Sequence, residues 1–360
     1  MTSRPPWQPT MEQELLLHAC LATNEFTEDA LREWENQTDL DDIDTGSMRL
    51  LPYLYRKIER AGVVARDHGR IKGIYARAWY LHNRRLTPAI EVLNSFPDSV
   101  PMFLLMKGAA LQVLIYGDDE PTRPADDVDI LIKPADIHEF MELMVDRGFG
   151  SGFLYTLEYS ELIMKSLGLR NGDIELDLNW RVNGFSLDSN VETRVFERRQ
   201  LIKVRGVDLY TLSLPDHFLH TLLHGSGWND ISPIRWVLDA ALIAQRLTVS
   251  DWEVIVQEVI ACGWGTPVLQ QMEYLKNMHQ VEVPQWVLDQ ISRSPISVAG
   301  VLMNKAVAQP TRIRRRIFRF AFAEYFYIRA YGGSPHPWLK FPGRLPKVWV
   351  KIFKEYFRKS

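Results

Sequence analysis

The chain has 360 residues, 46% of them hydrophobic and 24% charged, with a net charge of −3. These values are typical of an ordinary soluble protein, and the length leaves room for roughly two or three domains. The two cysteines, Cys20 and Cys262, are too few for a disulfide framework, so we expect a reducing compartment such as the cytoplasm. Because no secretory leader is recognisable and no run of about 18 apolar residues occurs, we predict neither secretion nor a transmembrane helix.

Residues 1–98 are predicted to form a helical region, because apolar side chains recur there at helical spacing. The expected helices lie at 12–22, from Thr27 onward, at 50–61 and at 66–96. The acidic stretch at 39–46 lacks the glycine-containing pattern of a calcium-binding loop, and we interpret it as a solvated link.

Residues 99–212 are the part in which strand and helix patterns alternate, and we predict a small mixed β-sheet there. The expected strands lie at 101–106, 127–132, 159–165 and 173–180, with helices at 108–116 and 135–147 and a short edge strand near 204–210. The last two main strands are expected to form a hairpin across a loop rich in Gly and Asn. Neither the GxGxxG pattern of a dinucleotide site nor a P-loop occurs. The fold class is therefore predicted to be α+β, with helical regions before and after the sheet.

Alternating acidic residues begin one of these strands. Asp127 and Asp129 precede an apolar run, and side chains at i and i+2 of a strand point to the same face. Two such carboxylates repel each other unless a cation lies between them, and oxygen ligands suit Mg²⁺. Asp177 lies in another expected strand and offers a third carboxylate. A solvated strand end is the alternative, because the Asp-x-Asp pattern alone is common.

A Lys-Gly pair, Lys107 and Gly108, follows the first expected strand and precedes a helical segment. A glycine at such a position lets backbone N–H groups approach a phosphate, and the start of a helix favours anions. The lysine adds a positive charge that suits a triphosphate. The pair therefore predicts a phosphate-binding site near the carboxylates.

Residues 213–310 are predicted to form a C-terminal helical bundle. His220 and His224 share one helical face, but the sequence around them lacks the glutamate of a zinc-binding HExxH motif and a clear third ligand. We therefore favour packing between helices over zinc binding. Arg235 and Asp239 have the same spacing and are expected to pair across one helical turn.

Residues 311–360 form a basic, aromatic-rich tail with 13 Lys/Arg and 2 Asp/Glu. The tail thus carries a charge of +11 and leaves −14 on the rest of the chain, an asymmetry that predicts an anionic partner. Basic and apolar residues at helical spacing suit an anionic membrane surface or a nucleic-acid backbone. The alternative is a helix packed on the bundle with its basic side chains outward.

Several motifs follow one another in a distinctive order: Lys107-Gly108, Arg123-x3-Asp127-x-Asp129, Asp177 with Trp180 close behind it, and the stretch from His224 to Ile243. Over about residues 100 to 245 the chain thereby resembles the uncharacterised nucleotidyltransferase family of the DNA polymerase β-type superfamily. The resemblance implies transfer of a nucleoside monophosphate from a nucleoside triphosphate (NTP), such as ATP, with two Mg²⁺ ions. It implies that Asp127, Asp129 and Asp177 are the catalytic and metal-binding residues. It also implies that Lys107, Gly108 and Arg123 bind the nucleotide.

The acceptor of the nucleotide is open at this point, and a small molecule, a peptide, a protein or an RNA end would each fit. A non-catalytic nucleotide- or peptide-binding accessory protein with a degenerate core is the alternative function. The intact Asp127, Asp129 and Asp177 oppose it, whereas the replacement of the superfamily's usual Gly-Ser by Lys107-Gly108-Ala109 favours it.

Overall fold

The computed structural model describes residues 5, 7–97, 99–117, 122–125, 127–151, 166–183, 186–225, 227 and 234–295. The basic tail at 311–360 and the strand predicted at 159–165 lie outside the described residues. No helix in the described ranges combines the length and the apolar character needed to cross a membrane.

The N-terminal region is helical, as the apolar spacing predicts. It consists of α1 (Met11–Leu21), the 3-10 helix η1 (Asn24–Phe26), α2 (Thr27–Gln37), α3 (Thr45–Met48) and α4 (Leu51–Ala61). Thr10 and Gln13 form a reciprocal capping box at the start of α1. In the acidic link, Asp44 accepts hydrogen bonds from the backbone N–H groups of Gly46 and Ser47, so it caps α3.

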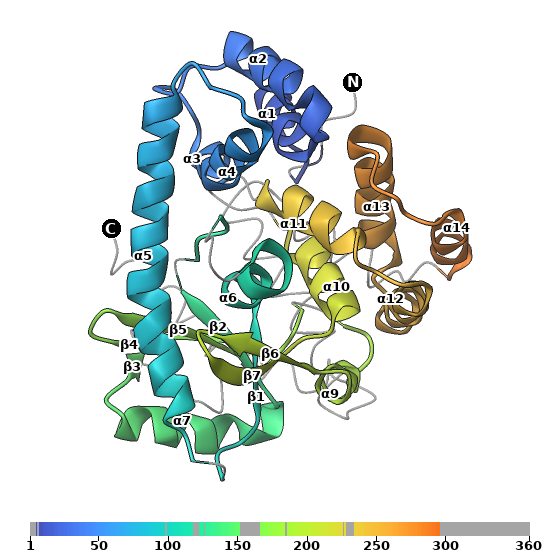
Figure 1. The fold of residues 1–360 in the computed structure, drawn as a ribbon. Coiled ribbons are helices and arrows are strands. Elements are labelled where there is room, and N and C mark those ends of the chain that lie inside the picture. The colour runs from blue at the N-terminus through green and yellow to red at the C-terminus, as the bar shows by residue number, and fades with distance from the viewer. Residues whose placement is uncertain are drawn as a thin grey trace, which may run out of the picture.

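One long helix joins this region to the sheet. Helix α5 (His68–Asn94) packs against α4 and then passes along the sheet, where it contacts β2 and β5 (Figure 1). Its buried residues in the second half, Leu86, Ala89, Ile90 and Leu93, belong to the same apolar cluster as the inner strands. The sheet is therefore supported from one side by α5, together with α7 (Ile137–Asp146), which follows the 3-10 helix η3 (Pro134–Asp136).

The sheet has seven strands in the order β3-β4-β5-β2-β1-β7-β6. Their bounds are β1 Phe103–Met106, β2 Val128–Ile132, β3 Gly150–Ser151, β4 Ser166–Asn171, β5 Ile174–Asn179, β6 Gln200–Val204 and β7 Val207–Thr211. β2 pairs in parallel with β5, and β1 with β7, whereas the other neighbours are antiparallel. The predicted α+β fold with a mixed sheet and helical flanks is confirmed.

Two details of the sheet differ from the prediction. The loop expected before β5 is itself a strand, β4, which buries Leu167 and Leu169 by alternation and turns into β5 through Gly172, whose φ is +56°. The single edge strand expected near 204–210 is a hairpin of β6 and β7. In both cases a short segment with only two or three apolar residues becomes a strand because a neighbour satisfies its backbone hydrogen bonds.

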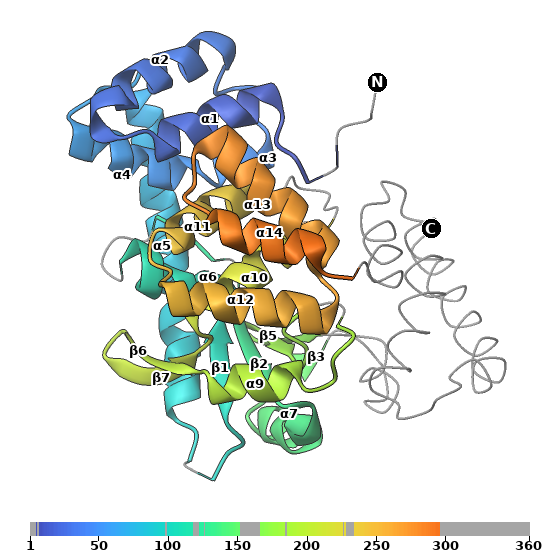
Figure 2. The same ribbon diagram turned by 90° about the vertical axis from the view of Figure 1, so that its right-hand side faces the viewer.

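The C-terminal half adds helices whose buried side chains form one apolar cluster with residues of β1 and β2 on the other side of the sheet. The helices are α10 (Leu214–Gly225), α11 (Arg235–Ala244), α12 (Val249–Cys262), α13 (Gly265–His279) and α14 (Gln285–Arg293), and Figure 2 shows α12, α13 and α14 beside one another. A single buried cluster contains Leu54 of α4, Leu104 of β1, Phe218 of α10 and Leu275 of α13. The apolar core thus includes residues from both sides of the boundaries predicted at residues 98 and 212. The division of the chain into domains at these boundaries stays a prediction.

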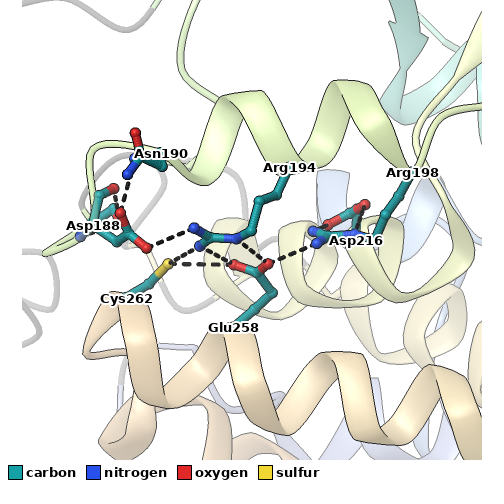
Figure 3. A network of polar contacts seen from close by, with 8 residues as sticks. Asp188, Asn190, Arg194, Arg198, Asp216, Glu258 and Cys262 are labelled. Carbon is teal, nitrogen blue, oxygen red and sulfur yellow. Dashed lines mark hydrogen bonds and ion pairs between the residues drawn. The ribbon is translucent and has the colours of Figure 1, made fainter.

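A charged network fastens the short helix α9 (Val191–Glu197) to this bundle (Figure 3). Arg194 and Arg198 both donate to the carboxylate of Glu258 on α12, at 2.7 Å. Arg194 also donates to Asp188, and Arg198 to Asp216 on α10. The pKa of Glu258 is lowered because these hydrogen bonds and charges outweigh its burial. The segment that follows β5 is thereby held against α10 and α12.

Candidate active site

Three carboxylates meet on the face of the sheet that is turned toward the C-terminal helices. The parallel pairing of β2 with β5 places Asp129 directly beside Asp177, and Asp127 immediately precedes β2. One ligand oxygen from each residue can be chosen so that all three lie within 4.8 Å of one another. The structure therefore brings together the three aspartates that the sequence predicts, although their catalytic and metal-binding roles stay predictions.

The three carboxylates differ in their exposure to solvent. Asp129 is only 3% exposed, Asp177 is half-buried and Asp127 is the most exposed of the three. Burial raises the pKa of the Asp129 carboxyl, and the charges of Asp127 and Asp177 add to this, while the Lys107 ammonium acts in the opposite direction; the pKa stands at about 7. The cluster is thus buried at Asp129 and more exposed to solvent at Asp127. Because water screens little at the buried end, a cation that offsets the negative charge there is favoured.

Lys107 provides such a charge. It follows Met106, which pairs with Asp129 across β1 and β2, and its backbone has the unusual φ of +51° for a non-glycine residue. Its ammonium bonds to Asp129 Oδ1 and lies 3.5 Å from Asp177 Oδ2. Burial lowers the pKa of Lys107, but the neighbouring carboxylates outweigh burial and hold the pKa above its usual value. The phosphate contact predicted for this lysine stays a prediction.

Asn179 completes the buried end of the cluster. Its Nδ2 donates to the backbone carbonyl of Asp177 at 2.9 Å, and it lies 3.3 Å from the carbonyl of Ile130 and 3.4 Å from Asp129 Oδ1. The side chain therefore ties β5 to β2 at the level of the carboxylates. The sequence motifs assign no site role to Asn179, but its position two residues after Asp177, on the same face of the strand, is the signal that points to it.

Gly108 lies where the chain approaches the loop before β2 most closely. A Cβ atom at this position would lie 2.6 Å from Ala125 Cβ and 2.9 Å from Arg123 Nη1. Gly108 belongs to α6 (Lys107–Leu111), which continues as the π-helical turn η2 (Gln112–Tyr116). The absence of a side chain is thus required for packing against this loop, whether or not a phosphate also approaches.

Arg123 is held by an acidic partner on α11. Its Nε and Nη2 donate to the two carboxylate oxygens of Asp239, both at 2.8 Å, and Tyr116 donates to the same carboxylate at 2.6 Å. Burial acts against the charge on Arg123, but Asp239 outweighs it and raises the pKa of the guanidinium. Arg235, expected to pair with Asp239, donates to the carbonyl of Pro124. The nucleotide contact predicted for Arg123 stays a prediction, and its contact with Asp239 joins the sheet region to the bundle.

His220 and His224, which share one face of α10, have other neighbours. His220 Nδ1 lies 2.7 Å from the carbonyl of Val182, and its ring centroid is 5.7 Å from that of His224. A second group that could hold a metal, Glu14, His18 and His279, joins α1 to α13. There the Tyr274 hydroxyl already donates to Glu14 at 2.5 Å.

The donor set of the aspartate cluster fits a hard divalent cation. All three side chains offer carboxylate oxygens, the ligands that Mg²⁺ takes in proteins, and the cluster is open to solvent at Asp127. The lysine ammonium against Asp129 and Asp177 shows that this geometry already stabilises positive charge. The residues present therefore fit a magnesium site.

A family model described as an uncharacterised nucleotidyltransferase matches residues 46–280. This range extends from α3 to the end of α13, so it includes the three aspartates, the sheet and most of the helices that pack on it. The comparison with curated proteins gave no match. The resemblance predicted for the middle of the chain is confirmed and extends well beyond it. The chain belongs to this family of uncharacterised nucleotidyltransferases.

Proposed function

We propose that the protein transfers a nucleoside monophosphate from an NTP to an acceptor hydroxyl or a related group. In this reaction the acceptor oxygen forms a bond to the α-phosphorus, the bond between that phosphorus and the β-bridging oxygen breaks, and pyrophosphate leaves. The observation that carries the proposal is the meeting of Asp127, Asp129 and Asp177 within 4.8 Å on two neighbouring strands of a nucleotidyltransferase family member.

Each aspartate has a place in this proposal. Asp127 and Asp129 would hold Mg²⁺ together with the phosphates of the NTP, since Mg²⁺ usually combines one or two carboxylates with substrate oxygens. Bound there, divalent ions would offset the charge on the triphosphate and orient it for in-line attack. Asp177 would accept the proton of the acceptor hydroxyl, because its half-buried carboxylate faces the same space as the other two. The resemblance implies two ions in total.

The residues around the carboxylates would hold the phosphates. Lys107 has its ammonium at the cluster, and Gly108 leaves the backbone beside it bare of a side chain. Arg123 is adjacent to Gly108 and would contact the nucleotide beside it, while Asp239 balances its charge. A cytoplasmic location is part of the proposal, since NTPs are available there and the two cysteines are buried free thiols.

The first experiment is a thermal shift of the purified chain with each of the four common NTPs, with and without Mg²⁺. We expect stabilisation by at least one NTP only when Mg²⁺ is present, because binding to the folded state raises the melting temperature. Stabilisation by no NTP under any condition would remove the proposal. Pyrophosphate release is then measured with small-molecule, peptide, protein and RNA fractions as acceptors. Nucleotide binding without pyrophosphate release from any fraction would favour the non-catalytic binding protein instead.

A further inference from the structure

The ammonium of Lys107 lies at the position from which a cation would bridge the two inner carboxylates. It bonds to Asp129 Oδ1 and lies 3.5 Å from Asp177 Oδ2. These two residues are neighbours in the parallel pair of strands, so their side chains leave the sheet side by side. A divalent ion shared by them would need an oxygen of each at about 2.0–2.1 Å. Such an ion would overlap the space that the ammonium fills.

An ion and the ammonium therefore exclude each other at the inner position. The two would lie within a few ångströms of one another, and like charges at that separation repel strongly in a partly buried site. The outer position is different, because Asp127 is the most exposed of the three carboxylates and Asp129 has a second carboxylate oxygen that can face it. An ion held by Asp127 and Asp129 would keep open sides for water and phosphate oxygens.

The backbone around Lys107 directs its side chain into the cluster. The residue follows β1 directly, with its positive φ of +51° turning the chain away from the strand. The next residue, Gly108, is wedged against Ala125 and the Arg123 side chain, so this turn has no room to shift toward the loop before β2. The Lys107 side chain is only 18% exposed. Its ammonium is thus a positioned part of the site and not a surface charge that happens to lie near.

The Lys107 ammonium already places one positive charge between Asp129 and Asp177. A divalent ion is then needed only at the outer position, between Asp127 and Asp129. We propose that the protein takes one divalent ion, between Asp127 and Asp129, and that the Lys107 ammonium serves as a built-in second cation between Asp129 and Asp177. This inference rests on the proposed function. The Lys107 ammonium takes the place of the second of the two ions that the family resemblance implies.

The test counts bound Mn²⁺, which stands in for Mg²⁺ and loses its free-ion electron paramagnetic resonance signal on binding. The parent chain is compared with Lys107→Met, which keeps an unbranched side chain without the charge, and with Lys107→Arg, which keeps the charge. We expect one ion per chain for the parent and for Lys107→Arg, and two for Lys107→Met. In addition, two ions about 4 Å apart should broaden each other's signal, so broadening is expected only in Lys107→Met.

Each outcome decides a separate point. Two ions in the parent, or one ion in a folded Lys107→Met variant, would overturn the role of the lysine and leave the proposed metal site standing. No ion in either protein would overturn the metal site and with it the proposed function. Asp127→Asn is the matched control, and it should lose the single ion of the parent. If Lys107→Met does not fold, as judged by its melting curve, the counts for the parent and Lys107→Arg decide the question.

Discussion

Replacing Asp239 by asparagine would remove the charge that balances Arg123 inside the protein. The two side chains are 11% and 4% exposed, and the carboxylate accepts both guanidinium hydrogen bonds at 2.8 Å. Asparagine has nearly the same shape, so packing is kept, but its amide offers one acceptor oxygen where the carboxylate offers two. The guanidinium would then remain in a buried place with its positive charge uncompensated.

The expected cost is large for a single substitution. Breaking a buried pair by removing one partner typically lowers the free energy of unfolding by about 3–5 kcal/mol. Asp208→Asn is the control, because Asp208 and Lys203 form a pair on the β6–β7 hairpin in which both side chains are more than half exposed. An exposed pair of this kind contributes about 1 kcal/mol or less. Substituting both Arg123 and Asp239 by apolar residues should cost less than Asp239→Asn alone, because no charge is left behind.

The assay is urea unfolding followed by tryptophan fluorescence and by circular dichroism. Coincidence of the two curves is required before a free energy is extracted. A loss of less than about 1 kcal/mol for Asp239→Asn, equal to that of Asp208→Asn, would refute the reasoning. It would mean that water reaches Arg123 readily, and that the arginine is available for a ligand.

Three further predictions concern the site and the tail. Without metal, Asp129→Asn should become more stable relative to the parent as the pH rises from about 4 to about 7. The pKa of Asp129 in the folded parent is raised to about 7, so the parent loses stability over this interval, whereas asparagine does not titrate. Melting temperatures of both proteins in EDTA across this pH range check the prediction, and a constant difference contradicts it. Gly108→Ala should lower the free energy of unfolding by about 1–3 kcal/mol, since its Cβ would lie 2.6 Å from Ala125 Cβ; urea unfolding tests this, and an unchanged midpoint speaks against the packing. Truncation before Thr311 should abolish salt-sensitive binding to anionic vesicles or RNA, and equal binding by both forms would remove the electrostatic interpretation.

The aspartate cluster could be predicted because strand alternation determines which side chains share a face. Asp127 and Asp129 had to point the same way once they began a strand, and the same holds for Asp177 and Asn179. Alternation alone does not say which strands are neighbours, however. The family resemblance supplied that step, and the parallel pairing of β2 with β5 bears it out.

The contacts of Lys107 and Arg123 could not be predicted in the same way. Arg123 and Asp239 are separated by 116 residues. Local helical spacing predicts instead that Asp239 pairs with Arg235, which is only four residues away. Lys107 lies 22 residues before Asp129. The direction of its side chain depends on a backbone turn with positive φ, and a lysine in the sequence does not indicate such a turn. Both contacts are set by tertiary packing, which periodicity does not encode.

The most direct test of the proposed transfer follows label from an NTP carrying it on the α-phosphate, with Mg²⁺ and the acceptor fractions, in the parent and in Asp129→Asn. The swap is nearly isosteric, so the variant should still fold, which a cooperative melting curve would show. It removes one carboxylate charge from the buried end of the cluster, and the loss should fall on the rate more than on nucleotide affinity. We predict label transfer and pyrophosphate release by the parent and neither by Asp129→Asn. A folded variant that turns over at the parental rate would contradict the assignment of these carboxylates to the reaction.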